Sequence, residues 1–294
     1  DCNSRWVSLD PYRGTIAAVV ESARNVSCVG AEPIAITNNL NFSSPETEIG
    51  YWQLASSCNG ISEACKALET PVTGGNVSLY NESKNQDNEI TPIHPTPVIG
   101  MVGKIDNVEK AISSEWKNIH DQIWIIGSYK SETTIAASSY LEYFHGEIAG
   151  RPPKLDLLDE KFSQRFLRNA ISKSFVVSAH DISDGGLAIA LAECCILSTK
   201  GATLELQKDF NRDDNSLFAE GGSRIIFSID KIKEKEWLNY LKKVQINFPS
   251  SIYLKKIGYV SNENLKIKIQ DTDICNIRVE ELTEKFNNSI SGYF

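Results

Sequence analysis

The sequence has little of what marks a secreted or membrane protein. Its 294 residues include seven cysteines, an odd number, and none of them forms a C-x-x-C pair. This usage fits reduced thiols better than a disulfide framework. No apolar run reaches the ~18 residues of a membrane span, and the first residues do not resemble a signal peptide. The sequence therefore predicts a cytoplasmic protein that does not enter a membrane.

The chain also lacks positive charge. Its net charge is -8, which argues against a nucleic-acid binder but leaves room for a local basic pocket that binds a small phosphate. Hydrophobic residues make up 41% and charged residues 23%, as in globular proteins, and the length suits about two domains. Because the chain begins with Asp1 and has a single methionine, Met101, we expect it to be a piece of a longer protein.

The most informative stretch is residues 72–82, where two adjacent glycines precede a run of amide and hydroxyl side chains. Glycine lets consecutive backbone N–H groups approach an anion closely. Asn76, Ser78, Asn81 and Glu82 carry oxygen atoms of the kind that Mg²⁺ binds together with substrate phosphates. The Walker pattern is absent. A glycine-rich hairpin turn is the structural alternative.

The first half predicts helices and strands that lead to polar loops. A helix is expected at residues 14–29, closed by Gly30, because apolar residues recur at helical spacing. A buried strand at 33–37 then opens into a polar loop at 38–42, the position where α/β sheets place ligands.

Further elements complete this half. Ser44 is expected to cap a helix that runs to Leu68. A short strand at 70–73 delivers the chain into the glycines, a hairpin follows at 84–95, and a strand at 96–103 ends the unit.

The second half alternates strand and helix, which is the α/β signature. The predicted strands are residues 122–127, 175–179, 224–229 and 253–260, and the predicted helices are 133–144, 155–172, 187–197, 231–244 and 279–290. We therefore predict two domains, at residues 1–110 and 118–294.

Two more polar motifs are candidate sites. In residues 180–186 two carboxylates face a tight turn before an apolar helix, where they suit either Mg²⁺ or capping by Ser183 or Asp184, and we favour capping. Glu220 opens a glycine-rich turn that we interpret as a plain helix-to-strand connection.

Other residues that attract attention have structural interpretations. The four histidines lack the spacing of a zinc motif. Cys194 and Cys195 are interpreted as buried helix residues, and the five tryptophans as core.

The motifs occur in an order that resembles a known family, the synthetase subunit (subunit II) of phosphoribosylformylglycinamidine synthase, in its C-terminal half. The resemblance covers nearly the whole chain. It is carried by Asp10-Pro11-Tyr12-Arg13-Gly14, Ala23-Arg24-Asn25, Asn39-Leu40-Asn41-Phe42, Gly75-Asn76-Val77-Ser78-Leu79-Tyr80-Asn81-Glu82, Pro95-Thr96-Pro97-Val98-Ile99-Gly100 and His180-Asp181-Ile182-Ser183-Asp184-Gly185-Gly186.

The resemblance implies a fold and a reaction. The fold is the aminoimidazole ribonucleotide synthetase-like two-domain unit, with an α+β N-terminal domain and an α/β C-terminal domain. The reaction is an ATP- and Mg²⁺-dependent ligation of purine biosynthesis, in which formylglycinamide ribonucleotide and ammonia form the amidine, ADP and phosphate. The implied partners are the N-terminal half of the same subunit, a glutaminase subunit and a small bridging subunit.

The resemblance also implies site residues. Gly75 matches an ATP-binding glycine, Asn76 a magnesium ligand and Ser78 a substrate contact. Asn38 falls where the family usually has an ATP-binding aspartate. An asparagine there still accepts a hydrogen bond, but it has lost the charge.

No catalytic residue is expected in this chain, because the family's catalytic histidines lie in the other half, so the fragment alone should be inactive. By pseudo-symmetry Asp181 and Glu220 match a metal-binding aspartate and a substrate-binding run, whose later side chains are glycines here. A second hypothesis is therefore a non-catalytic scaffold that holds a structural nucleotide or nothing and docks the partners. Another synthetase or kinase of the superfamily is a more distant alternative.

Overall fold

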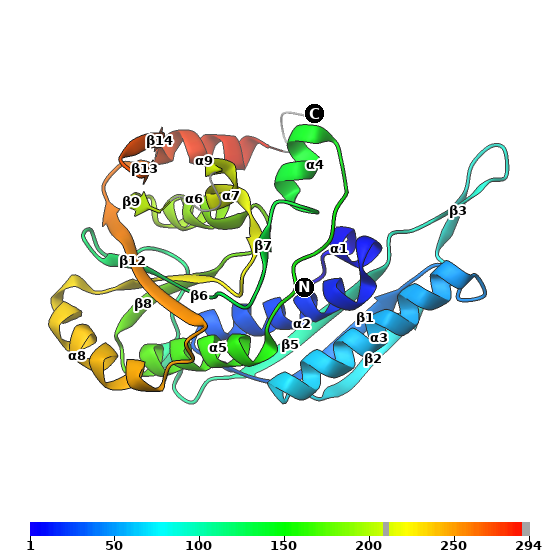
Figure 1. Cartoon of the computed structure of the whole chain (residues 1–294), viewed down its shortest axis with the longest axis horizontal. Helices are drawn as coiled ribbons and strands as arrows, with labels where there is room; N and C mark the ends of the chain where they lie inside the picture. The colour runs from blue at the N-terminus through cyan, green and yellow to red at the C-terminus, as the bar shows by residue number, and fades with distance from the viewer. Residues whose placement is uncertain (208–211, 290–294) are drawn as a thin grey trace.

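A computed structural model describes residues 1–207 and 212–289. Its first part is a three-stranded sheet of order β2-β1-β5, covered on one face by α2 and α3 (Figure 1). The elements of this part are α1 (Ser4–Leu9), α2 (Pro11–Cys28), β1 (Glu32–Asn41), α3 (Glu48–Leu68), β2 (Val72–Ser78), β3 (Glu82–Lys84), β4 (Ile90–Pro92), β5 (Thr96–Lys104) and the 3-10 helix η1 (Val108–Lys110). The hairpin β3-β4 projects from the sheet, as the sequence predicted.

Helix α2 forms as predicted, with an earlier start. Asp10 caps it by accepting a hydrogen bond from the N–H of Arg13 at 3.0 Å, and Pro11 occupies the first turn. Gly30, with φ of 92°, follows the helix end in the left-handed conformation that glycine adopts without strain.

The start of α3 differs from the prediction. Thr47, not Ser44, is the N-cap, and its hydroxyl accepts a hydrogen bond from the N–H of Gly50 at 3.0 Å. The helix ends at Leu68 as predicted, and Glu69 follows in the left-handed region with φ of 62°.

The two polar loops predicted in this half are wrong, because both stretches are strand. Residues 38–41 belong to β1, and the glycines at 74 and 75 belong to β2. Strand β1 is central: it pairs in parallel with β2 and antiparallel with β5. Backbone hydrogen bonds on both sides hold the asparagines in the sheet despite their low β-propensity.

The second part is a mixed seven-stranded sheet of order β14-β13-β9-β12-β6-β11-β8. Among the described residues every pairing in it is antiparallel except that of β9 with β13. Its strands are β6 (Gln122–Ser128), β8 (Val176–Asp181), β9 (Gly201–Leu206), β11 (Ile225–Ile229), β12 (Ile252–Ser261), β13 (Asn264–Ile269) and β14 (Thr272–Arg278). The sequence did not predict β9, β13 or β14.

Helices cover both faces of this sheet (Figure 1). One face packs on α5 (Leu157–Ser172) and α8 (Glu234–Val244), and the other on α6 (Gly186–Ser198), α7 (Asp213–Phe218) and α9 (Val279–Asn288), with short 3-10 helices η2 (Lys231–Lys233) and η3 (Gln245–Asn247) beside α8. Cys194 and Cys195 are fully buried in α6, as predicted. Trp52 is 49% exposed on α3, so the prediction that all five tryptophans are core is wrong. The last residue of the predicted helix 279–290 lies outside the described residues.

The predicted helix at 133–144 is two elements. Strand β7 (Thr133–Thr134) pairs with β10 (Glu220–Gly221), and α4 (Ser139–His145) starts only after Ser138, which accepts a hydrogen bond from the N–H of Leu141. The pairing with β10 keeps the first residues extended.

The two sheets are joined by packing of α2 on α5 and on β8. Arg24 of α2 is buried at this junction and its Nη1 lies 3.3 Å from Oε2 of the fully buried Glu160 of α5. Along the sequence, the strands of the first sheet end before residue 105 and those of the second begin after residue 121. The domain limits themselves stay a prediction. Among the described residues no helix combines the length and apolarity that crossing a bilayer requires.

Candidate functional site

The four predicted site residues lie on β1 and β2, on opposite faces of the sheet. Side chains alternate along a strand, and residues paired across neighbouring strands share a face. Asn38 pairs with Gly75, while Asn39 pairs with Asn76. Asn38 lies between Ile36 and Leu40 in the strand's alternation, and those two belong to the core under α2 and α3. Asn38 and Gly75 therefore belong to the helix-covered face.

Asn38 and Gly75 are in close contact. A Cβ on Gly75 would collide with the Oδ1 atom of Asn38 and would lie 2.5 Å from its backbone oxygen. Gly74, the preceding residue, has open space at the corresponding position. Only the second glycine is thus needed for the Asn38 side chain to lie over β2.

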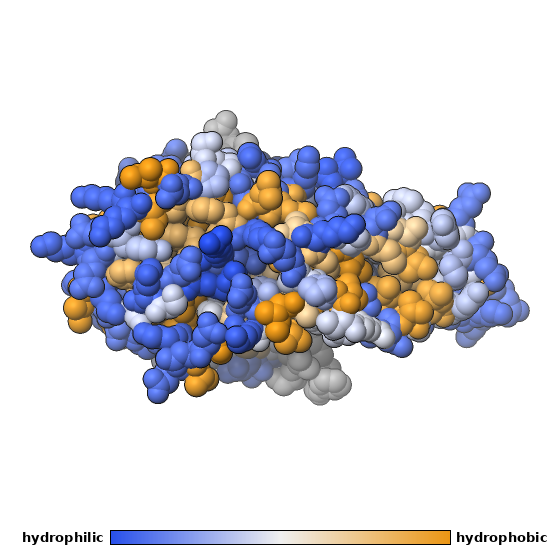
Figure 2. Space-filling model, turned by 90° about the horizontal axis from the view of Figure 1, so that it is seen from below, coloured by the Kyte–Doolittle hydropathy of each residue, from blue (hydrophilic) through white to orange (hydrophobic). Residues whose placement is uncertain are grey.

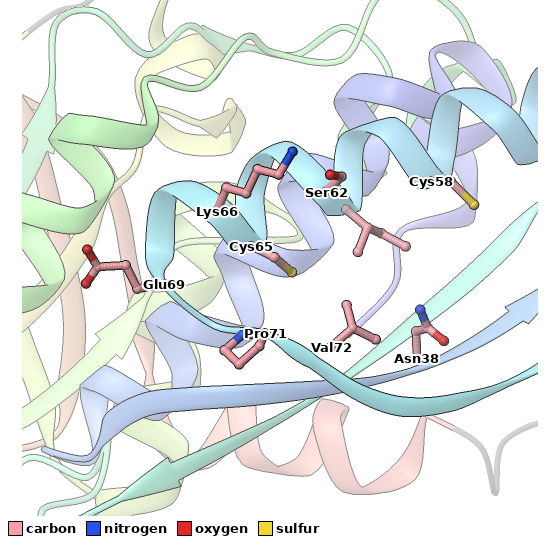
Figure 3. A pocket seen from close by; sticks show the side chains of 9 residues that line it. Asn38, Cys58, Ser62, Cys65, Lys66, Glu69, Pro71 and Val72 are labelled. Carbon is pink, nitrogen blue, oxygen red and sulfur yellow. The ribbon is translucent and has the colours of Figure 1, made fainter.

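Asn38 also lines a groove of about 540 Å³ between α3 and the start of β2. In Figure 3, Cys58 and Cys65 of α3 point toward Val72 and Asn38, while Glu69 lies at the far end. The wall is mainly apolar, and its polar residues are Asn38, Ser62, Lys66 and Glu69. An apolar cavity with few polar groups is the usual form of a small-molecule site.

The sequence did not indicate this groove, although its signal is present. Residues 58, 61, 62, 65, 66 and 69 recur at helical spacing and line one side of the groove from the end of α3. The other side, at the start of β2, follows only from the pairing of β1 with β2, which the sequence did not predict.

Asn76 and Ser78 belong to the opposite, open face of the sheet. The exposed Asn76 donates a hydrogen bond from Nδ2 to Oδ1 of Asn39 at 3.2 Å. The hydroxyl of Ser78 donates to Oδ1 of Asn81 at 3.2 Å, and Nδ2 of Asn81 donates to the backbone oxygen of Phe42 at 3.1 Å. Asn81 thus fastens the end of β2 to the end of β1.

The donor set fits Mg²⁺ only in part. Asn76 bonds to Asn39 through its amide nitrogen, so its amide oxygen can supply one ligand. In the part of the chain that the structure describes, no three His, Cys, Asp or Glu side chains form a metal cluster. Mg²⁺ often has few protein ligands and shares phosphate oxygens, so Asn76 suits a cation carried by a nucleotide and not a site enclosed by protein.

A partly buried charged network lies apart from this sheet, at the end of β8. His180 approaches Asp181 Oδ1 at 3.3 Å and Glu193 Oε2 at 3.1 Å. Burial lowers the pKa of His180, but its hydrogen bonds to Asp181 and Glu193 outweigh burial and raise the pKa to about 10. Burial raises the pKa of Asp181, but His180 and Arg24 together bring it below its usual value. These side chains stabilise one another's charged forms, as expected of a structural network.

The predicted capping by Ser183 or Asp184 is wrong. Gly185 is the N-cap of α6, with φ of 75°, and its N–H donates to Oε1 of Glu220 at 2.8 Å. The same oxygen accepts the N–H of Ser139, the first residue of α4, also at 2.8 Å. Glu220 is therefore a fully buried carboxylate that ties two helix starts together.

Comparison with known families decides the relationship. A model described as AIR synthase related protein, N-terminal domain, matches residues 1–105, and one described as AIR synthase related protein, C-terminal domain, matches residues 118–267. The chain belongs to the AIR synthase related family. Its aminoimidazole ribonucleotide synthetase-like fold, predicted from the sequence, is thereby confirmed.

Curated relatives are longer than this chain. It is 86% identical, over all 294 residues, to phosphoribosylformylglycinamidine synthase subunit PurL of Prochlorococcus marinus strain MIT 9312, and covers 38% of that protein. It is 50% identical over 298 residues to the PurL of strain MIT 9303, covering 99% of this chain and again 38% of the relative. The chain thus spans 38% of the length of these relatives.

A solved structure supports the fold alone. PurL of T. maritima complexed with FGAR superposes with a TM-score of 0.70 at 18% identity, covering 94% of this chain and 44% of that one.

Proposed function

We propose that this chain is the C-terminal half of the synthetase subunit of phosphoribosylformylglycinamidine synthase. In this reaction formylglycinamide ribonucleotide, ATP and glutamine-derived ammonia form formylglycinamidine ribonucleotide, ADP and phosphate. The observation that carries the proposal is the 86% identity to a PurL along the entire chain. The catalytic groups belong to the other half of the subunit, so the fragment alone does not turn over.

In this proposal the two faces of the sheet bind different ligands. The groove beside Asn38 has the size and apolar wall for a base of ATP, and Gly75 lets Asn38 lie at its inner end. On the open face, Asn76 offers an oxygen to Mg²⁺ bound to phosphate, and Ser78 offers a hydroxyl to the ribonucleotide. In the described part of the chain β2 is an edge strand, and in this proposal the N-terminal half lies against its outer edge.

The partners in this proposal are that N-terminal half, the glutaminase subunit and a small bridging subunit. The exposed apolar side chains on α3 and β2 favour a covered surface there, and Figure 2 shows apolar side chains gathered on the part of the face that carries these elements. They are Ile49, Tyr51, Trp52, Val72 and Val77. A cytoplasmic location remains part of the proposal.

Substitutions on the open face test the proposal in the full-length subunit. Asn76→Asp or Ser78→Ala should lower the turnover of ammonia and formylglycinamide ribonucleotide at least about tenfold, the order expected when a reacting group loses its position. Thr272→Ala, at an exposed position of β14 in the other sheet, is the control for a small substitution away from both faces of the first sheet. Unchanged kinetics in both test variants, measured by ADP release, would refute the assigned roles.

The scaffold alternative rests on Glu220. Its carboxylate is fully buried and accepts hydrogen bonds from two backbone N–H groups. It therefore has a structural role and does not face a substrate. A structure of the full subunit with ATP and substrate separates the two functions. Contact of Gly75, Asn76 and Ser78 with these ligands supports the active half, and their separation from both ligands supports the scaffold.

A further inference from the structure

A second cavity, of about 250 Å³, lies where α5 meets the end of α3 and the start of β1. Three cationic side chains of α5 line it, Lys161, Arg165 and Arg168. Their spacing of four and three residues places them along one face of the helix. The remaining walls are mostly polar, and they include Glu32 and Glu69.

The cations around this cavity are only partly compensated. Nζ of Lys161 lies 3.1 Å from Oε1 of Glu69, in a pair that is well exposed to water and therefore weak. Nη1 of Arg168 donates to the hydroxyl of Ser27 in α2 at 2.8 Å, which fixes the guanidinium against the cavity wall. The side chain of Arg165 has neither an ion pair nor a hydrogen bond with any residue that the structure describes.

The positive charges of the two arginines also repel each other. Burial lowers the pKa of Arg168, and the charge of Arg165 lowers it further, against the opposite effect of Glu32. In a chain of net charge -8, two neighbouring guanidinium groups at a polar cavity are unusual, since acidic partners are abundant. An oxyanion between them would remove the repulsion and accept paired hydrogen bonds from both planar guanidinium groups.

We propose that this cavity binds a small phosphate monoester with a hydroxylated body. The phosphate is held by Arg165 and Arg168, with Lys161 at its edge. A cavity of about 250 Å³ has room for more than a phosphate group, and the carboxylates of Glu32 and Glu69 accept hydrogen bonds from hydroxyl groups of the body.

This site is separate from the one at Asn38. Glu32 begins β1 and Asn38 lies six residues further along it, which corresponds to about 20 Å of strand. Glu69 lines both cavities from the left-handed turn after α3. The proposal stands on its own contacts and does not depend on the proposed function.

Calorimetric titration of the full-length subunit with glycerol 3-phosphate tests the site, in a buffer free of phosphate and nucleotide. Arg165→Gln should weaken binding at least about tenfold, as expected when a charge-assisted hydrogen bond is lost. Arg168→Lys, which keeps the charge but not the fork, should weaken it less. Lys266→Gln, at an exposed position of β13, is the control for the loss of one positive charge.

Three results would overturn the proposal. One is unchanged affinity for glycerol 3-phosphate in the Arg165→Gln variant. Position 165 is exposed, and a thermal melting curve checks that this variant is folded. Another is equal weakening in Arg165→Gln and Lys266→Gln, which would indicate a general charge effect. The third is that glycerol or inorganic phosphate binds as tightly as glycerol 3-phosphate, since the proposal requires both the phosphate and the hydroxylated body.

Discussion

Gly75 and Gly74 are adjacent in sequence but differ in what surrounds them. The space above Gly75 is filled by Asn38, whereas that above Gly74 is open. Glycine is thus required at the second position by packing, without any ligand. The sequence motif alone does not distinguish the two.

Alanine substitutions separate the two glycines. Gly75→Ala should destabilise the protein by about 1–3 kcal/mol, because the added methyl group displaces Asn38 or parts β1 from β2. Gly74→Ala, the matched control, should change the free energy of unfolding by no more than about 0.5 kcal/mol. Urea unfolding followed by circular dichroism measures both. Equal midpoints for the two variants would contradict the contact with Asn38.

At the residue scale, the sequence indicates which polar side chains are close together, but not which face of the sheet each one occupies. The sequence predicts one loop for the site residues 75, 76 and 78. Strand geometry sends Asn76 and Ser78 to one face and Gly75 to the other. That division depends on long-range pairing with β1, which local patterns do not specify.

At the scale of elements, Glu220 connects the starts of α4 and α6 through a single oxygen. Burial, followed by the nearby charge of Asp184, raises the pKa of Glu220 to about 7 from a usual 4.5, although its bonds to Gly185 and Ser139 act in the opposite direction. The folded state therefore holds a proton on Glu220 more tightly than the unfolded chain does. The stability that this proton contributes is complete below pH 4.5 and is lost as the pH rises through about 7.

Glu220→Gln should remove this part of the pH dependence. The amide oxygen still accepts both N–H groups but carries no charge, so the stability of the variant relative to the wild type should rise between pH 4.5 and 8. Melting temperatures across this range measure the effect. Glu21, whose pKa burial raises to about 7, is present in both proteins and leaves a residual slope.

Two comparison variants sharpen that experiment. Glu220→Ala loses the acceptor and should be less stable at every pH, since the buried N–H groups of Ser139 and Gly185 lose their partner. Glu205→Gln, at an exposed position of β9, controls for the loss of one negative charge. A Glu220→Gln profile parallel to that of the wild type would contradict the titration of Glu220.

Elements with strong local signals were predicted well, and those that depend on distant partners were not. Helix α2 follows from apolar residues at helical spacing, although its cap Asp10 was not predicted, and α5 and α6 also lie where the sequence predicts helices. Strand β13 is an exception, because Leu265, Ile267 and Ile269 alternate with polar residues, a local strand signal that the prediction missed. Strand β14 carries aspartate and asparagine and depends more on its pairing with β13. The cap of α6 was missed for the same reason, because Glu220 lies 35 residues from Gly185.

At the scale of the whole molecule, the junction of the two sheets contains a buried ion pair. Arg24 is 4% and Glu160 0% exposed, and Nε2 of Gln164 donates to the other oxygen of Glu160 at 2.9 Å. A buried charge that loses its partner is costly, whereas an exposed pair contributes little.

Arg24→Ala should therefore destabilise the protein by about 3–5 kcal/mol, because it leaves the carboxylate of Glu160 buried without compensation. Lys104→Ala, which breaks the exposed pair with Asp106, should cost at most about 1 kcal/mol. Chemical unfolding of both variants gives the comparison. The double change Arg24→Met and Glu160→Leu should recover most of the loss, and a double variant as unstable as Arg24→Ala would contradict the electrostatic explanation.

Strand β2 lies at the edge of its sheet, and this has a practical consequence for work with the isolated chain. Residues 72–78 contain neither a charged side chain nor a proline, and Val72 and Val77 are about half exposed, at 47% and 55%. Natural edge strands usually carry such groups to prevent added strands. We expect the isolated chain to self-associate as its concentration rises, and a lysine at position 77 to keep it monodisperse in light scattering.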